Sequence, residues 1–212
     1  MTPPLGQVLA WYELARAEGV PEPEAAALAT ATPDGRPSVR MVLIRGIDAR
    51  GVAFYTNRNS RKGRELADNP QAAIAIHWHA LQRQIRLEGP VELLSDEESD
   101  AYFATRAHGS QIGAWASDQS AVIPDYETLE RRVVEFGTRF PADVPRPPHW
   151  AATCCAPTRS SSGRAARTAS TSGSGTGATV TAGGPSGSLP DWWDPCHIRL
   201  PGEPWPSARS PA

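Results

Sequence analysis

Residues 25–57 contain three apolar runs separated by two short segments of turn residues, at 33–35 and 48–51. This arrangement predicts three consecutive antiparallel strands, because turn residues between runs of this length allow the chain to reverse. The runs "QAAIAIHW" and "RQIRLEGPVELL" predict two further strands. Helical segments stand between some of the strands, but without the regular βαβ alternation of a parallel sheet. The chain is therefore predicted to form a small antiparallel barrel of the α+β class with peripheral helices.

Four segments carry helical patterns. Ser60 is a suitable N-cap for a short helix that ends near residues 69–70. Ser95 and Glu98 form a capping box that opens a helix through Arg106. The segments "PLGQVLAWYELARAEG" and "YETLERRVVEFGTRF" predict amphipathic helices. Their inward residues are Leu5, Val8, Leu9 and Tyr12 in the first helix, which stops at Gly19, and Leu129, Val133 and Phe136 in the second.

Length and composition limit the class of protein. A chain of 212 residues fits one domain, and a formal net charge of −2 gives no reason to expect nucleic acid as a partner. No apolar run approaches the length of a membrane span, and no leader segment opens the chain. All cysteines lie beyond Trp150, as expected of a reducing compartment. These features predict a soluble cytoplasmic protein.

The regular pattern ends after Trp150. Ser, Thr, Gly, Ala and Pro dominate residues 151–190. A segment of this composition buries too little apolar area to offset the entropy of the chain. We therefore expect residues 1–150 to form the folded domain and residues 151–212 to form a disordered, low-complexity tail.

The segment "NSRKGREL" places Arg61 and Lys62 in the first turn of a helix. Free backbone N–H groups and the positive end of the helix dipole already favour an anion there. Taken alone, the segment would be better explained as a solvated basic turn. Lys62 is, however, the only lysine in the chain, and this favours a phosphate site.

Two strands carry polar side chains at alternating positions. In "RMVLIR", Arg40 faces one side and Arg45 the other, so both could hold phosphate or flavin oxygens in a bidentate manner. Arginines near strand ends also commonly reach solvent without a ligand. In "RQIRLEG", Gln84 shares the polar face of a half-buried strand, and its contact with a ligand amide is only one option.

The segment "YFATRAHGS" places Tyr102 and Arg106 on one helical face, with Ser110 just beyond. A phenol, a guanidinium and a hydroxyl are donors suited to a phosphate monoester. From the spacing alone, a Tyr–Arg stack on the surface is as good an explanation.

Other polar clusters do not predict a site. His77 and His79 lie on the same side of a strand, but without a third ligand they are interpreted as rim histidines and no metal is expected. Glu97, Glu98 and Asp100 form a charged helix start. The chain contains no P-loop, nucleophile elbow or dinucleotide fingerprint.

Taken together, these segments resemble the pyridoxine/pyridoxamine 5′-phosphate oxidase family, which uses FMN. The resemblance runs from Pro4 to Trp150 through "RMVLIRG", "FYTN", "SRKGREL", "RQIRLEG", "SDAYFATR", "GSQIGAWASDQS" and "VPRPPHW". It implies an FMN-binding split barrel that forms a homodimer with the cofactor at the interface. It also implies transfer of a hydride from C4′ of pyridoxine or pyridoxamine phosphate to flavin N5, with O2 as the acceptor and H2O2 as a product.

The resemblance assigns site residues by position. The flavin would carry the redox chemistry, so no catalytic side chain is assigned. Where the family usually has lysine at the end of "RMVLIR", this chain has Arg45. The implied FMN contacts are Arg40, Met41, Val42, Leu43, Ile44, Arg45, Tyr55, Thr56, Arg61, Lys62, Gln84, Gln119 and Ser120, and the implied substrate contacts are Arg45, Tyr102, Arg106 and Ser110.

The tail departs from the family, which continues after His-Trp with Gly-Gly-Tyr and later with Phe-Trp-Gln-Gly and Arg-Leu-His. If one G is restored after the Trp150 codon, codons permitted by "AATCCAPTRSSSGRAA" spell Gly-Gly-Tyr-Val-Leu-Arg-Pro-Asp-Ala-Ile-Glu-Phe-Trp-Gln-Gly-Arg. The segment "RTASTSG" then permits Arg-Leu-His-Glu-Arg. The tail is thus interpreted as a shifted reading frame that lacks FMN contacts, substrate contacts and the closing strands of the barrel.

Two other functions stay open from the sequence. The first is another split-barrel flavoprotein, such as a flavin reductase or a general FMN-binding protein, and an impaired FMN-binding remnant belongs with it. The Tyr102, Arg106 and Ser110 set disfavours the first. The second is a binding module without catalytic activity whose tail recruits partners. This second function is disfavoured because the tail, translated in the shifted frame, gives the residues expected of the family.

Overall fold

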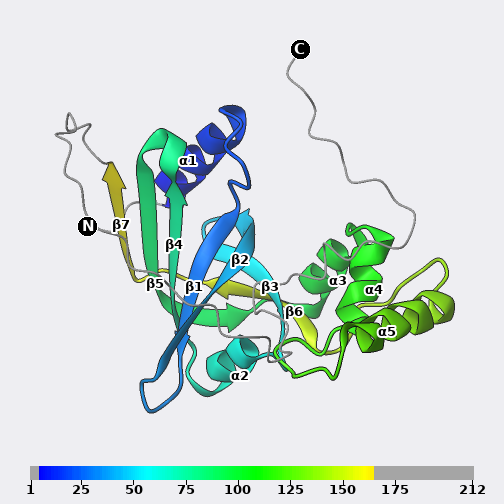
Figure 1. Cartoon of the computed structure of the whole chain (residues 1–212). Coiled ribbons are helices and arrows are strands. Elements are labelled where there is room, and N and C mark those ends of the chain that lie inside the picture. The colour runs from blue at the N-terminus through cyan, green and yellow to red at the C-terminus, as the bar shows by residue number, and fades with distance from the viewer. Residues whose placement is uncertain (1–4, 165–212) are drawn as a thin grey trace, which may run out of the picture.

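The computed structural model describes residues 5–164, which form a barrel with helices around it (Figure 1). The helices are α1 (Leu5–Ala17), α2 (Arg61–Asp68), α3 (Asp96–Ala104), α4 (His108–Ala116) and α5 (Tyr126–Arg139), with a short 3₁₀ turn η1 (His79–Leu81). The strands are β1 (Ala25–Ala31), β2 (Pro37–Ile47), β3 (Val52–Asn57), β4 (Gln71–Trp78), β5 (Arg83–Leu93), β6 (Trp150–Cys155) and β7 (Arg159–Arg164).

Six of the strands close into an antiparallel barrel. They follow the order β4-β1-β2-β3-β6-β5, and pairing between β4 and β5 closes the ring. Strand β7 pairs with β5 over residues 83–88, next to the place where β6 pairs with residues 91–93 of the same strand. Closure removes the free edges that an open antiparallel sheet would expose. The predicted antiparallel barrel of the α+β class is confirmed.

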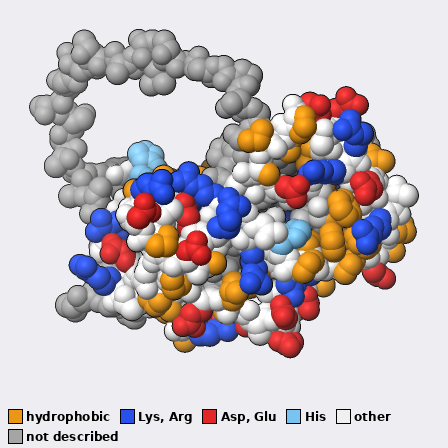
Figure 2. All heavy atoms as spheres, turned by 90° about the horizontal axis from the view of Figure 1, so that it is seen from below, with side chains coloured by type: hydrophobic (Ala, Val, Ile, Leu, Met, Phe, Trp, Pro, Cys, Tyr) orange, Lys and Arg blue, Asp and Glu red, His pale blue; other side chains and the backbone are white. Residues whose placement is uncertain are grey.

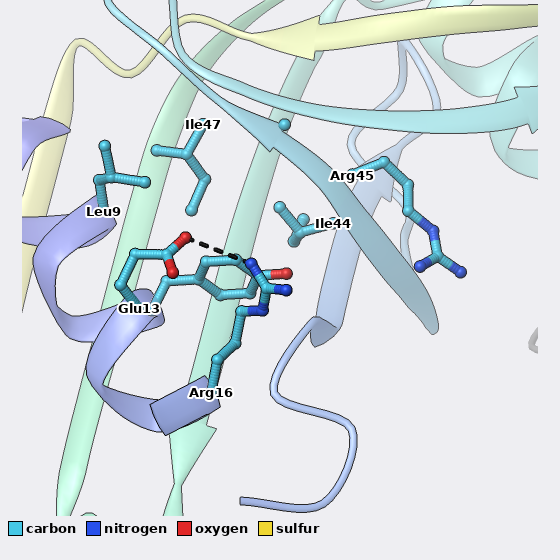
Figure 3. A pocket seen from close by; sticks show the side chains of 8 residues that line it. Leu9, Glu13, Arg16, Ile44, Arg45 and Ile47 are labelled. Atoms are coloured by element: carbon cyan, nitrogen blue, oxygen red, sulfur yellow. Dashed lines mark ion pairs between the residues drawn. The ribbon is translucent and has the colours of Figure 1, made fainter. Parts of the chain in front are cut away.

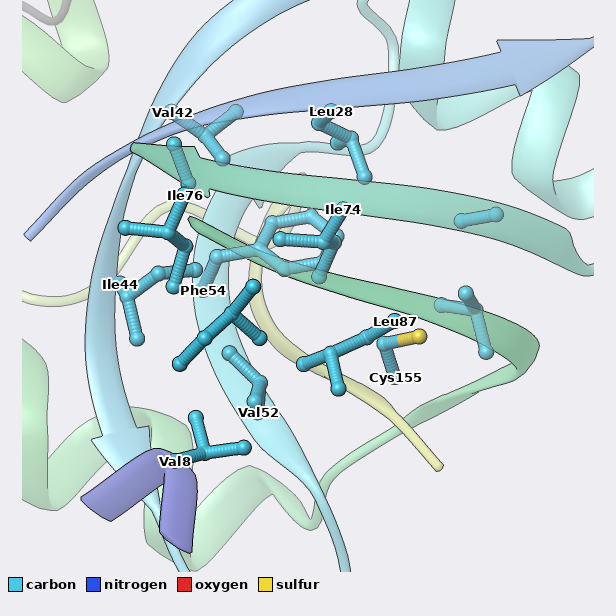
Figure 4. Close-up of a cluster of buried hydrophobic side chains, with 14 of the residues drawn as sticks. Val8, Leu28, Val42, Ile44, Val52, Phe54, Ile74, Ile76, Leu87 and Cys155 are labelled. Carbon is cyan, nitrogen blue, oxygen red and sulfur yellow. The ribbon is translucent and has the colours of Figure 1, made fainter. Parts of the chain in front are cut away.

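The barrel interior is filled by the apolar faces of its strands. Figure 4 shows Leu28, Ile44, Phe54 and Ile74 pointing toward one another, with Val8 of α1 at one end of the cluster. Each of these side chains is at most 1% exposed. Alternation explains this, because successive residues of a strand face opposite sides of the sheet. A second cluster joins α4 to α5, and Figure 1 shows α3, α4 and α5 gathered on one side of the barrel.

The expected hairpins and helix caps are present, with some differences in the helices. Gly35 has a φ of +86° in the β1–β2 turn, and Ser60 and Ser95 cap α2 and α3 as predicted. Helix α3 ends at Ala104 rather than continuing through Arg106, and the sequence did not predict α4. Helix α4 contains two glycines, so packing rather than helix propensity stabilises it, and most of its residues are buried.

The expectation of a disordered tail from residue 151 is wrong for residues 151–164. Strand β6 pairs with β3 from Asn57↔Trp150 to Val52↔Cys155, and all six of its residues are buried. After Trp150, the run "WAATCC" contains only small and mostly apolar side chains, so it fits between β3 and β5. Its backbone hydrogen bonds form regardless of side-chain identity. The prediction failed because it used the average composition of residues 151–190, in which this short run has little weight. Residues 165–212 lie outside the described residues.

Candidate functional site

Lys62 and Gln119 come together at the start of α2, as expected if both belong to one site. The Lys62 Nζ donates to Gln119 Oε1 at 2.8 Å, although 57 positions separate the two residues. Lys62 is only 3% exposed. Ser60 orients this turn, because its hydroxyl accepts from the Gly63 N–H at 3.2 Å and fixes the first turn of the helix.

Arg40 is buried in a polar network inside the barrel wall. Its guanidinium donates to Thr30 Oγ1 at 2.6 Å and to Ser38 Oγ at 2.5 Å, and it pairs with Glu65 at 3.3 Å. The predicted alternation of the strand is confirmed, because Arg40 points inward whereas Arg45 is exposed. Arg40 therefore extends from β2 toward Glu65 of α2 and does not reach solvent.

Glu65 connects Arg40 to Arg61. Its Oε1 accepts from Arg61 Nε at 2.9 Å, and its Oε2 accepts from the hydroxyls of Thr30 and Ser38, each at 2.5 Å. Burial raises the pKa of Glu65, but hydrogen bonds from Ser38, Thr30 and Arg61, together with the charge of Arg40, outweigh it and lower the pKa to about 2. The carboxylate is therefore charged at neutral pH.

Tyr102 and Arg106 meet Tyr55 and Trp150 in an aromatic cluster. The rings of Tyr55 and Tyr102 stack at 3.9 Å between centroids, and Tyr55 stacks on Trp150 at 4.8 Å. The Arg106 guanidinium carbon lies 5.1 Å from the Trp150 ring centroid. Burial is the main cause that raises the pKa of Tyr55 to about 12, so its phenol stays neutral. The cluster thus joins an expected cofactor contact to two expected substrate contacts.

Three further predicted residues lie around these groups. Ser110 is in the first turn of α4 and 9% exposed, and Thr56 at the end of β3 is 5% exposed. Ser120 has a φ of +68°, a left-handed conformation that is uncommon for serine. Such conformations cluster at ligand sites, so Ser120 beside Gln119 fits a binding loop.

Other predicted contacts lie apart from this group within one chain. Arg45 stands at a β-bulge of β2, pairs with Glu24 at 3.6 Å, and extends on the opposite side of the strand from Glu13 and Arg16 (Figure 3). It borders a cavity of about 280 Å³ between α1 and β2. Leu9, predicted to face inward, lines this cavity and is 40% exposed. Met41 and Gln84 are exposed, whereas Leu43 is half-buried and Val42 and Ile44 belong to the barrel core.

The face shown in Figure 2 and the two histidines of β4 and η1 give no sign of another kind of site. On the face shown in Figure 2, basic and acidic side chains are interspersed. The rings of His77 and His79 contact each other at 5.8 Å. Among residues 5–164, no three potential ligands gather as a metal site requires. Within the same residues, no helix combines the length and apolar character needed to cross a bilayer.

The sequence analysis missed Glu65, Thr30 and Ser38. A signal for Glu65 was present, because it follows Arg61 by four positions and such pairs meet on a helix. Thr30 and Ser38 face each other across the β1–β2 hairpin, and its turn at 33–35 was predicted. The approach of α2 to that hairpin, in contrast, is a tertiary contact with no local signal.

The fold and these polar groups define a class, the antiparallel split-barrel proteins with a cationic site at a helix start. An FMN-binding protein related to pyridoxamine 5′-phosphate oxidase, from Nostoc punctiforme, shares the fold with a TM-score of 0.60 at 19% identity, covering 76% of this chain and 85% of its own. PhzG from Burkholderia lata, solved with tetrahydrophenazine-1-carboxylic acid, has a TM-score of 0.75 at 33% identity, covering 79% and 82% of the two chains.

Sequence comparison gives the family. A sequence model described as pyridoxamine 5′-phosphate oxidase matches residues 14–140. The pyridoxine/pyridoxamine 5′-phosphate oxidase of Cupriavidus necator is 53% identical over 147 residues, 69% of each chain. That of Nostoc punctiforme is 53% identical over 148 residues, again 69% of each chain. The chain belongs to the pyridoxamine 5′-phosphate oxidase family, a family of oxidoreductases.

Proposed function

We propose that the protein oxidises pyridoxine 5′-phosphate or pyridoxamine 5′-phosphate to pyridoxal 5′-phosphate, with FMN as cofactor and O2 as acceptor, and releases H2O2. The observation that carries the proposal is the buried Lys62, which meets Gln119 at the N-terminus of α2 beside Arg61. Cations and free N–H groups at a helix start suit a phosphate monoester. Bound FMN would supply the two-electron redox chemistry.

The residues of the chain would then bind and orient the reactants. Lys62, Arg61 and Arg40 would hold the FMN phosphate, with Gln119 fixing the Lys62 ammonium. The phenol of Tyr102 and the guanidinium of Arg106 would hold the substrate phosphate together with the Ser110 hydroxyl. The stack of Tyr55 on Tyr102 and Trp150 would keep the Tyr102 ring in place for this contact.

We also propose a homodimer that works in the cytoplasm. The outward face of β2 exposes apolar side chains, with Val39 68% and Met41 46% exposed, and a second copy would cover them. The expected contacts Arg45 and Gln84, which lie apart from the others in one chain, fit a site shared between two copies. Residues 1–150 contain no cysteine, in keeping with a reducing compartment.

An oxidase assay tests the reaction. Purified protein with added FMN is expected to form pyridoxal 5′-phosphate and H2O2 from pyridoxamine 5′-phosphate, and to act far less well on pyridoxamine, which lacks the phosphate. PhzG, a relative at 33% identity, was solved with tetrahydrophenazine-1-carboxylic acid, so that compound is the competing substrate. Turnover of that compound without turnover of pyridoxamine phosphate would favour a phenazine oxidase. Flavin binding without turnover of either compound would favour a general FMN-binding protein.

Lys62→Met is expected to weaken FMN binding by roughly 10- to 100-fold, because one charged contact to a phosphate contributes about 1.5–3 kcal/mol. The unfolding temperature of the apo protein should not fall much, since Lys62 opposes the positive end of α2. Titration of flavin fluorescence measures the affinity. Arg131→Met on the exposed face of α5 is the control and should leave FMN binding unchanged. Equal affinities in wild type and Lys62→Met would contradict the assignment of this site.

A further inference from the structure

Arg146 connects helix α3, which carries Tyr102, to the first residue of β6, Trp150. Its Nε donates to Asp100 Oδ1 at 2.5 Å, and its Nη2 donates to Asp96 Oδ1 at 2.7 Å. Its Nη1 donates to the carbonyl oxygen of Trp150 at 2.6 Å. We propose that Arg146 is a positioning residue for the substrate phosphate, because it fixes Tyr102 relative to Trp150. The proposal rests on the proposed function, since it adds a residue to the same site.

The two carboxylates allow Arg146 to hold one face of α3. Asp96 and Asp100 are four positions apart in this helix, so their side chains lie on the same face. The Arg146 side chain is 11% exposed, whereas the two aspartates are 83% and 61% exposed. Because ion pairs with solvated carboxylates contribute little to stability, their main consequence here is geometrical. The planar guanidinium has N–H groups in fixed directions, so its bonds to three oxygens orient the helix.

The backbone of β6 completes the link between helix and strand. Trp150 and Ala152 both direct backbone groups toward α3, as the alternation of an antiparallel strand requires. The Ala152 N–H donates to the hydroxyl of Ser99, a fully buried residue of α3, at 3.1 Å. The Ala152 carbonyl oxygen accepts from the Leu94 N–H at 3.0 Å. With Arg146 bonded to the Trp150 carbonyl, α3 is fixed to β6 at two alternate residues of the strand.

The aromatic cluster depends on this link. The ring of Tyr102 lies parallel to that of Trp150, with an interplanar angle of 3° and 6.2 Å between the centroids, and Tyr55 of β3 stacks on both. Tyr55 is paired with Ala152 across β3 and β6. Alignment of rings from three elements requires that α3 keep its place beside the start of β6. Loss of the Arg146 contacts would therefore move the Tyr102 phenol, the donor assigned to the substrate phosphate.

Arg146→Met tests the link, because it keeps an unbranched stem and removes the three hydrogen bonds. With FMN at saturating concentration, we expect the KM for pyridoxamine 5′-phosphate to rise about threefold to tenfold, as for a weakened hydrogen bond to the phosphate. The kcat should change less, since the flavin carries the redox chemistry and the phosphate contact serves binding. The near-UV circular dichroism of the apo protein should change as the stacked rings lose their alignment. An unchanged KM would overturn the proposal, and so would unchanged circular dichroism.

Arg50→Met is the matched control. Arg50 also pairs with two carboxylates, Asp48 and Glu98, at 2.8 Å each. Glu98 belongs to α3, but Arg50 links this helix to the β2–β3 turn rather than to β6. The control should leave the KM and the circular dichroism unchanged. An equal rise of the KM in Arg50→Met would overturn the proposal, because any loosening of α3 would then be sufficient.

Arg146→Lys is a conservative second variant. It keeps the charge but lacks the planar fork that reaches three oxygens, so it should give a KM between those of wild type and Arg146→Met. Should Arg146→Met fail to fold, Arg146→Lys decides. A raised KM in this variant supports the proposal, and an unchanged KM contradicts it.

A double-mutant cycle distinguishes positioning of Tyr102 from general loss of structure. Tyr102→Phe keeps the stacked ring and removes the hydroxyl assigned to the phosphate. If Arg146 acts through that hydroxyl, adding Arg146→Met to Tyr102→Phe should raise the KM much less than adding it to wild type. Full additivity of the two effects would overturn the proposal. Failure of both the present and the frame-restored chain to oxidise pyridoxamine 5′-phosphate would contradict the proposed function instead, while circular dichroism would still decide whether Arg146 aligns the rings.

Discussion

Restoring one guanine after the codon of Trp150 is expected to raise the affinity for FMN roughly 100-fold or more, and oxidase turnover with it. The restored frame would supply the Trp and the final Arg that the family resemblance assigns to FMN, and the Arg-Leu-His that it assigns to substrate. A charged contact with the phosphate contributes about 1.5–3 kcal/mol, and burying one large aromatic side chain contributes a similar amount. The restored and present chains should be compared by flavin content after purification, by FMN titration and by H2O2 formation.

A chain that stops after Arg164 is the control for this comparison. It keeps every element from α1 to β7 and removes the tail without adding the restored residues. If the tail only interferes with the site, this shorter chain should gain as much affinity as the restored chain. A present chain that already purifies with full flavin occupancy and normal turnover would contradict the frameshift interpretation.

Gly51→Ala is expected to destabilise the fold by about 2–4 kcal/mol, from backbone strain and overpacking together. Gly51 has a φ of +154°, and a Cβ there would lie 2.0 Å from the carbonyl oxygen of Cys155. The clash is with backbone of β6, which cannot rotate away as the end of a flexible side chain could. Denaturant unfolding of the two proteins measures the difference.

Gly35→Ala is the matched control, because Gly35 also has a positive φ, +86°, but a Cβ there would meet nothing within 4 Å. It should cost only the conformational strain, about 1 kcal/mol. The difference between the two variants therefore reports on β6 itself. Equal destabilisation by both would mean that residues 150–155 do not close the barrel beside β3 in solution.

The position of Trp150 to Cys155 explains how a shifted frame could still complete the barrel. Strand pairing uses backbone groups, and the buried positions of β6 are filled by small side chains such as Ala152 and Cys154. Gly89 leaves room for the connection between β6 and β7. A Cβ at this position would lie 2.3 Å from the Ala156 carbonyl oxygen. The lost contacts would therefore concern ligands more than closure of the barrel.

Much of the site could be anticipated from local signals, and the rest could not. The start of α2 was predicted from Ser60 as its N-cap, and strand alternation placed Arg40 and Arg45 on opposite faces of β2, although it did not say which face is inward. Helix α4 was missed because its glycines give weak propensity, and it is stabilised by contacts with α5. The stack of Tyr55 on Tyr102 and Trp150 joins three distant segments, and no local pattern indicates such a meeting.

By itself, the sequence determined strands β1 to β5, the caps, the family resemblance and the chemical types of the site residues, because hydrophobic periodicity and turn residues act over a few positions. Only the tertiary structure decided that Glu65 lies between Arg40 and Arg61, that Lys62 meets Gln119, and that "WAATCC" is a barrel strand. These outcomes depend on which surfaces the closing barrel brings together, and contacts between residues far apart in sequence are fixed by packing of the whole domain.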